Sequence, residues 1–197
     1  MKSSLLVVGL CLTQVSLVGV PTLAQLADNT AKLSPEPIRG FVTGSTYRNP
    51  SLGVEFTVPE ELQLRQPEMK TYARTGGVKI YVDAWSKPHK FLKYIDAWIV
   101  FSAETLASLP VKFQSTGGFM LLMAQRERKE GYKPLQGEST EKLGEVEFLR
   151  ADYGRGSRRE IVLASLRENY AYVFIFSASD VAAADALIKS TTLKLPQ

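Results

Sequence analysis

The chain of 197 residues contains one cysteine, Cys11, and one histidine, His89. Disulfides, structural zinc sites and iron–sulfur clusters need more of these residues, so the sequence excludes them. Serine–histidine–aspartate catalysis would need His89 as its base, and the G-x-S-x-G motif that presents a nucleophilic serine is absent. Because Lys87 and Lys90 flank His89 and Pro88 precedes it, we interpret it as a histidine of a surface loop.

A large excess of charge of one sign is also missing. The chain has 24 Lys and Arg residues against 20 Asp and Glu residues, a net charge of +4, which is too weakly basic to indicate a dedicated nucleic-acid-binding protein. EF-hand, HExxH and phosphate-loop motifs are absent as well. Glu145 and Glu147 share a strand face, and Glu138 and Glu141 lie near them. The strand period of two residues places such side chains together for solubility alone. We therefore expect no metal site, no cofactor and no nucleic-acid partner.

Hydrophobic runs are concentrated at the amino terminus. Residues 5–20 are mostly apolar, and the small residues Thr22 and Ala24 precede a peptide bond at which a signal peptidase can cut. This order is typical of a secretory signal peptide spanning residues 1–24. The alternatives are a retained membrane anchor, for which about 20 apolar residues are needed, and a lipoprotein modified at Cys11. We expect export, to the periplasm or to the extracellular space.

Composition divides the rest of the chain into two parts. Residues 25–44 are rich in Asp, Asn, Ser, Pro and Gly, which indicates a flexible leader. Residues 45–197 show the strand and helix patterns of one folded domain. The whole chain, with 45% hydrophobic and 22% charged residues, has the composition of an ordinary folded protein.

Alternation of apolar and polar residues predicts a series of short strands joined by tight turns. The predicted strands are residues 53–59, 78–85, 94–101, 145–153, 159–166, 170–177 and 192–195. Short turns between successive strands favour a mainly antiparallel sheet, which the last strand closes. A helix over residues 91–109 is the alternative for the third of these segments. The segment 170–177 is apolar on both faces, so we expect other elements to cover it on both sides.

Two helices are predicted within this strand pattern. One spans residues 115–130, with Ser115 or Thr116 as its N-cap and Gly131 after its end, although the two glycines at residues 117 and 118 would allow it to start only at Phe119. The other spans residues 180–190 with Ser179 as its cap. The expected class is therefore α+β, an antiparallel sheet flanked by helices.

The sequence resembles PsbP-like domains at both ends of the predicted domain. Residues 47–59 read YRNPSLGVEFTVP, in which an aromatic residue, an asparagine, a glycine and an alternating strand ending in proline recur. An aromatic strand, a short helix and the segment STTLKL then close residues 46–195 in a similar order. The resemblance implies an α/β sandwich that binds or stabilises partners, as in secreted bacterial members of unknown role. The chain departs from the family at residues 60–62 and lacks the metal-ligand pattern of the photosynthetic members.

Aromatic stripes and one charged pair are the candidate ligand-binding residues. The stripes consist of Tyr81 with Trp85, Tyr94 with Trp98, and Tyr170 with Tyr172. They could line a groove at a half-wet surface, or lie in the core under helices. Arg150 and Asp152 share one strand face; we expect a structural pair if that face is covered, and polar anchors for a ligand if it opens to a cleft.

Arginines gather at the predicted turn at residues 154–157. Arg155, Arg158 and Arg159 could bind carboxylates or phosphates, and the end of the first helix adds further basic residues. This rim could associate weakly with anionic surfaces. The alternative is a solvated turn beside a helix that carries an Arg126–Glu130 ion pair.

We hypothesise from these patterns an exported, non-enzymatic binding or scaffold module whose partner is a protein or a cell-envelope component. The alternative is a small-ligand-binding protein, or a hydrolase-type enzyme, that uses the aromatic sheet face with Arg150 and Asp152. Electrostatic association through the arginine turn is the third hypothesis.

Overall fold

The computed structural model describes residues 39–72, 77–86 and 97–195, all within the unit formed by residues 35–197. Two antiparallel sheets and two α-helices make up the described part of this unit, which confirms the predicted α+β class. The predicted signal peptide, His89 and Tyr94 lie outside the described residues.

The smaller sheet has the strand order β1–β2–β3–β13. Its strands are β1 (Phe41–Thr43), β2 (Thr46–Asn49), β3 (Val54–Thr57) and β13 (Thr192–Lys194). The prediction of a flexible leader up to residue 44 is wrong for its last residues, because β1 pairs with β2 and the Tyr47 hydroxyl donates to the Arg39 carbonyl at 3.0 Å.

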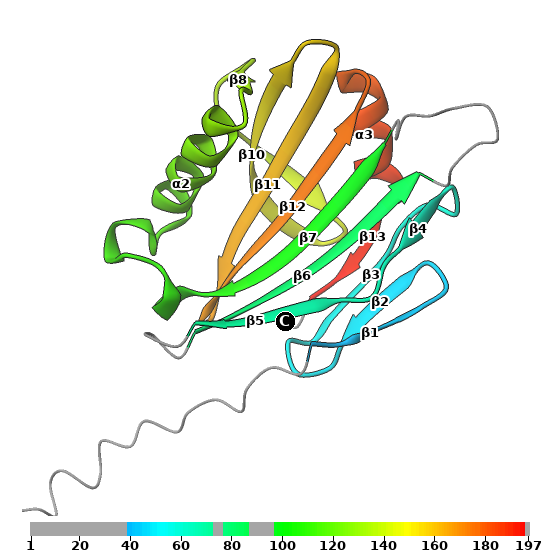
Figure 1. Cartoon of the computed structure of the whole chain (residues 1–197), viewed down its shortest axis with the longest axis vertical. Helices are drawn as coiled ribbons and strands as arrows, with labels where there is room; N and C mark the ends of the chain where they lie inside the picture. Colours follow the sequence, from blue (N-terminus) through cyan, green and yellow to red (C-terminus); the bar gives the residue numbers. More distant parts are fainter. Residues whose placement is uncertain (1–38, 73–76, 87–96, 196–197) are drawn as a thin grey trace, which may run out of the picture. The chain divides into compact units, whose positions relative to one another are not determined.

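The larger sheet has the order β4–β6–β7–β12–β11–β10–β8, with β5 added beside β6 and β9 beside β10 (Figure 1). Its strands are β4 (Leu62–Leu64), β5 (Glu68–Tyr72), β6 (Gly77–Ser86), β7 (Trp98–Thr105), β8 (Lys133–Pro134), β9 (Ser139–Leu143), β10 (Val146–Arg155), β11 (Arg158–Arg167) and β12 (Tyr170–Ala178). The alternative of a helix over residues 91–109 is wrong where the structure describes them, because β7 pairs with β6 on one side and β12 on the other. Two short 3₁₀ helices follow β7, Leu106–Ser108 and Val111–Phe113.

The carboxy-terminal strand does not close the larger sheet as predicted. β13 pairs with β3 instead, with Leu193 opposite Phe56, and so belongs to the smaller sheet. The alternation of residues indicates a strand but not the partner with which it pairs.

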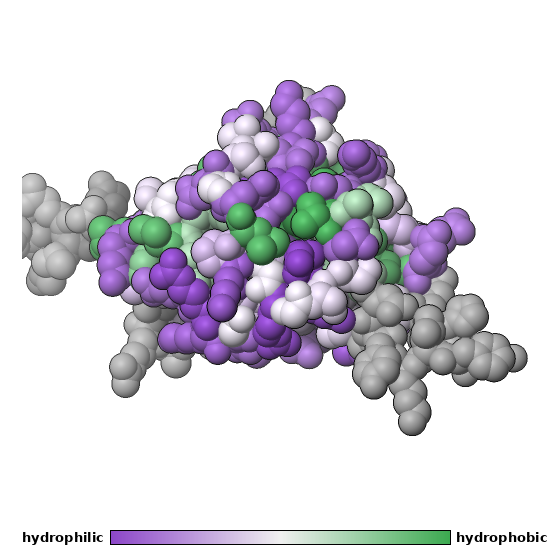
Figure 2. Space-filling view, turned by 90° about the horizontal axis from the view of Figure 1, so that it is seen from above, coloured by the Kyte–Doolittle hydropathy of each residue, from purple (hydrophilic) through white to green (hydrophobic). Residues whose placement is uncertain are grey.

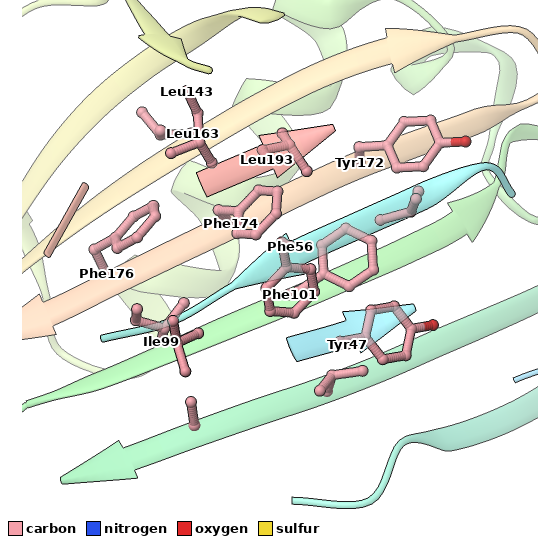
Figure 3. Close-up of a cluster of buried hydrophobic side chains, with 14 of the residues drawn as sticks. Tyr47, Phe56, Ile99, Phe101, Leu143, Leu163, Tyr172, Phe174, Phe176 and Leu193 are labelled. Atoms are coloured by element: carbon pink, nitrogen blue, oxygen red, sulfur yellow. The ribbon is translucent and has the colours of Figure 1, made fainter. Parts of the chain in front are cut away.

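The inner face of the larger sheet packs against the smaller sheet through aromatic rings. Phe56 of β3 lies 5.1 Å from the ring of Phe101 and 5.4 Å from that of Phe174, and Tyr47 lies 5.2 Å from Phe56 (Figure 3). The helix α3 (Val181–Ser190) contributes Ala184 to the same cluster and packs on β11 and β12. Burial of these large rings provides much of the free energy that joins the two sheets.

The outer face of the larger sheet is partly covered by α2 (Thr116–Lys129), which packs on β10 and β11 (Figure 1). Phe119, Met120 and Met123 of this helix form a second core with Val162 and Val173 of the sheet. β12 is therefore covered on both faces, as its two apolar stripes predict.

Capping residues set the starts of both helices. The Ser115 side chain accepts the Gly118 N–H at 3.1 Å, so α2 includes both glycines and the alternative start at Phe119 is wrong. A Cβ atom on Gly118 would clash with the Lys112 carbonyl oxygen, which explains a glycine there. In α3 the cap is Asp180, whose side chain accepts the Ala183 N–H at 2.8 Å, and not Ser179 as predicted.

Surface hydrophobic residues are scattered. On the face seen in Figure 2, hydrophilic residues predominate and hydrophobic ones form small separate groups. No helix among the described residues is long and apolar enough to cross a membrane.

Candidate functional site

Arg150 lies at the centre of a buried ion cluster on the inner face. Its Nε and Nη2 atoms donate to the two oxygens of Asp152 at 2.8 and 2.9 Å, and its Nη1 atom lies 2.9 Å from Glu141 and 2.8 Å from Asp185. Gln136 donates to the same Asp152 carboxylate at 2.9 Å. The cluster therefore ties β9, β10 and α3 together.

This geometry confirms the structural pairing of Arg150 with Asp152. The two side chains are 8% and 3% exposed, and hydrogen bonding to Asp152 raises the pKa of Arg150. All three guanidinium nitrogens bind carboxylates of the same chain, so the cluster stabilises the fold. The sequence did not predict Glu141 and Asp185 as partners because they come from other elements.

Two stacked tryptophans lie on the opposite, outer face of the larger sheet. Trp85 is the second-last residue of β6 and Trp98 is the first residue of β7, and their rings are 5.5 Å apart with 16° between their planes. The Trp85 indole N–H donates to Asp83 at 2.6 Å, and the Arg65 guanidinium lies 5.1 Å from the Trp85 ring. Tyr81 shares this face, two residues before Asp83 on β6. We call these five residues the indole patch.

The predicted aromatic stripes do not form one groove. Tyr172 packs in the inner core with Phe101, and Tyr170 packs against that core from the same face. Trp85 and Trp98 are half-buried on the other face. Successive residues of a strand point to opposite faces, and the register of β6, β7 and β12 decides which stripes lie together.

A pair of buried carboxyl groups that the sequence did not indicate joins α2 to β11. Glu127 of α2 is 6% exposed and Glu160 of β11 is 3% exposed, and their side chains hydrogen-bond to each other. Burial, together with the charge of Glu160, raises the pKa of Glu127 to about 8. The Tyr132 hydroxyl hydrogen-bonds Glu160 as well. Two carboxyl groups that share one proton can bind each other in this way, which holds the end of α2 on the sheet.

The spacing of residues along α2 could have predicted that Glu127 is buried. It follows Phe119 and Met123 at successive steps of four residues, and so lies on the buried stripe of α2. In the structure, Arg126 Nη2 lies 3.7 Å from Glu104 of β7, so the predicted Arg126–Glu130 ion pair is wrong.

The arginines of the β10–β11 turn bind groups of the same chain. Arg155 donates to the Glu130 carbonyl at 2.6 Å and lies 4.8 Å from the Tyr132 ring. Arg158 donates to the Ser177 hydroxyl at 3.2 Å, and Arg159 donates to the Gly156 carbonyl at 2.9 Å. Association of this turn with anionic surfaces stays a prediction.

Within the described part of the chain, no group of three or more Asp, Glu, His or Cys residues could hold a metal ion.

Comparisons with known proteins concern the fold. No family model and no curated protein matches the chain. Among solved structures, the chain is similar to the solution structure of cyanobacterial PsbP (CyanoP) from Synechocystis sp. PCC 6803, with a TM-score of 0.37 and 8% sequence identity over 65% of this chain and 92% of that chain.

Proposed function

We propose that the chain is an exported, non-enzymatic binding module that holds a protein partner through the indole patch. The stacked pair of Trp85 and Trp98, with Arg65 against the first ring, carries the proposal. Tryptophan, tyrosine and arginine are the residue types on which the free energy of protein–protein binding is concentrated.

The indole patch is ordered before any partner arrives. The hydrogen bond from Trp85 to Asp83 and the 3.7 Å ion pair of Arg65 with Asp83 restrict the rotamers of both side chains. The Arg65 backbone N–H also donates to the Asp83 carbonyl at 2.9 Å, which fixes the chain that carries it. Little side-chain entropy is then lost on binding, and this favours affinity.

The competing hypothesis of an enzyme that uses Arg150 and Asp152 has less support. These two residues lie on the inner face, away from the indole patch, and the Arg150 nitrogens already bind Asp152, Glu141 and Asp185. A substrate would have to displace these ion pairs.

A photo-crosslinking amino acid placed at Tyr81 tests the proposal in cells that export the protein. We expect a discrete cross-linked protein species, which should weaken when Trp98→Ala is added. The matched control carries the same crosslinker at Leu121 of α2, which is 60% exposed and outside the patch. Cross-linking at Leu121 alone, or a Tyr81 product that Trp98→Ala leaves unchanged, would contradict the proposal.

Export itself rests on the amino-terminal pattern. We expect the mature protein to begin at Gln25, which amino-terminal sequencing of the secreted or periplasmic protein checks. Detection of only the full-length chain in the cytosolic fraction would contradict export.

A further inference from the structure

Two neighbouring strands of the larger sheet separate at one end. The pairing of β10 with β11 runs from Leu149 opposite Ala164 to Arg155 opposite Arg158. The first residues of β10, from Val146 on, pair only with β9, which lies on the side of β10 opposite to β11. Over the same stretch β11 continues to Arg167 and pairs with β12. The end of β11 therefore extends beyond its ladder with β10.

A cleft of about 620 Å³ opens at this point, and we call it the edge cleft. Its walls are the turn of residues 144–146, residues 193–195 at the end of β13, and Arg167. The volume lies within the range of small-molecule sites, roughly 300–1,000 Å³. The edge cleft is separate from the indole patch. The residues of the larger sheet that line the cleft lie on the inner face of that sheet, whereas the patch lies on its outer face.

Close packing of the turn on β13 shapes the edge cleft. Gly144 has a φ of +64°, and a Cβ atom there would lie 2.5 Å from the Leu193 carbonyl oxygen. Only glycine allows this approach without strain. Leu193 itself extends into the inner core among the side chains drawn in Figure 3. Two walls of the cleft are thus held in place by the fold.

The lining of the edge cleft combines an apolar floor with one available cation. Val146 and Leu193 are each 5% exposed, and the half-buried Leu195 extends their surface. Lys194 is already 3.3 Å from Glu55. Arg167 is a half-buried residue, and its guanidinium makes no hydrogen bond or ion pair with any residue in the described ranges. Among the described residues its charge has no counter-ion, at a position where contact with solvent is reduced.

We propose that the edge cleft binds an amphipathic monoanion, an alkyl chain that carries one carboxylate head group. The head group pairs with the Arg167 fork, whose planar donors match a carboxylate. The alkyl chain covers Val146, Leu193 and Leu195. Glu145 on the rim repels further negative charge, so a single charge is favoured over a double one.

Isothermal titration of the exported protein with decanoate, below its micelle concentration, tests the proposal. We expect saturable binding of decanoate at one site. Acetate and decanol should each bind about tenfold more weakly or worse, because acetate lacks the long alkyl chain and decanol lacks the charged head group. Arg167→Gln should weaken decanoate binding about tenfold. The control Arg128→Gln makes the same charge change on the exposed surface of α2 and should leave binding unchanged.

A second pair of variants separates charge from folding. Leu195→Asp and Leu195→Asn remove the same apolar contact, and only the aspartate adds repulsion, so decanoate should bind Leu195→Asp more weakly. Thermal melts of all variants check that they fold. Absence of saturable decanoate binding, equal binding of decanol, or an equal loss in Arg128→Gln would overturn the proposal. These outcomes leave cross-linking at the indole patch unaffected, so the two proposals fail separately.

Discussion

The carboxyl group of Glu127, which is buried against Glu160, makes the stability of this protein depend on pH. Burial raises the pKa of Glu127 from its ordinary value of 4.5 to about 8. Between these pH values the folded protein holds a proton that the unfolded chain has lost. The free energy of unfolding therefore falls as pH rises through this window, by at most about 1.4 kcal/mol per pH unit.

Glu127→Gln should flatten this slope. The amide can donate to Glu160 as the protonated carboxyl does, and it does not titrate. The substitution leaves the neighbouring groups in place. These are Arg126 and Glu130 on the same helix, and Tyr132 beside Glu160. Urea unfolding at several values between pH 5 and pH 9 measures the difference. Glu130→Gln is the matched control at the end of the same helix, and parallel profiles for all three proteins would contradict the prediction.

Arg150→Met should destabilise the fold strongly. It leaves Asp152, which is 3% exposed, beside two other carboxylates without a cation. Loss of one partner of a buried ion pair costs about 3–5 kcal/mol. Arg48→Met is the control, because Arg48 is 55% exposed in its pair with Glu55 and should change the free energy of unfolding by less than about 1 kcal/mol. Equal losses in chemical denaturation would argue against the buried cluster as a determinant of stability.

At the scale of elements, the N-cap of α3 distinguishes two neighbouring residues. Asp180→Ala removes the acceptor of the Ala183 N–H and should cost about 1 kcal/mol. Ser179→Ala should leave stability within a few tenths of that of the wild type, since Ser179 is exposed and does not cap the helix. Denaturant titration of both variants measures the two losses in free energy of unfolding. A larger loss in Ser179→Ala than in Asp180→Ala would show that Ser179 is the cap.

The element patterns were largely predictable. Alternation predicted β3, β6, β10, β11 and β12, and capping residues with the periodic apolar positions predicted both helices. Gly131 has a φ of +85° after α2, as a glycine after a helix end favours. The N-caps were less predictable, because Ser179 and Asp180 are adjacent and both are good caps.

At the scale of the whole molecule, one aromatic cluster joins the two sheets. Phe56→Ala should lower the free energy of unfolding by about 3–5 kcal/mol, because Phe56 is 1% exposed between Phe101 and Phe174. Both tryptophans of the chain lie on the larger sheet, so their fluorescence reports whether a change in the smaller sheet unfolds it too. We expect fluorescence and far-ultraviolet circular dichroism to shift together. Phe41→Ala, at 47% exposure on β1, is the control with little expected effect.

The candidate sites were predictable only in part. The pairing of Arg150 with Asp152 follows from their spacing of two residues on one strand. The separation of Tyr170 and Tyr172 from Trp85 and Trp98 does not, because the register between β6, β7 and β12 decides it. Strand register depends on contacts between segments far apart in the chain.

Local patterns in the sequence determined the type of most elements, the cap of α2 and the α+β class. These features depend on neighbours within a few residues, so the sequence alone expresses them. Tertiary structure decided that β13 joins β3 in a second sheet, that Glu141 and Asp185 complete the Arg150 cluster, and that Glu127 meets Glu160. It also opened the edge cleft beside Arg167. Each of these depends on how separate elements pack and twist against one another, which no short stretch of the sequence contains.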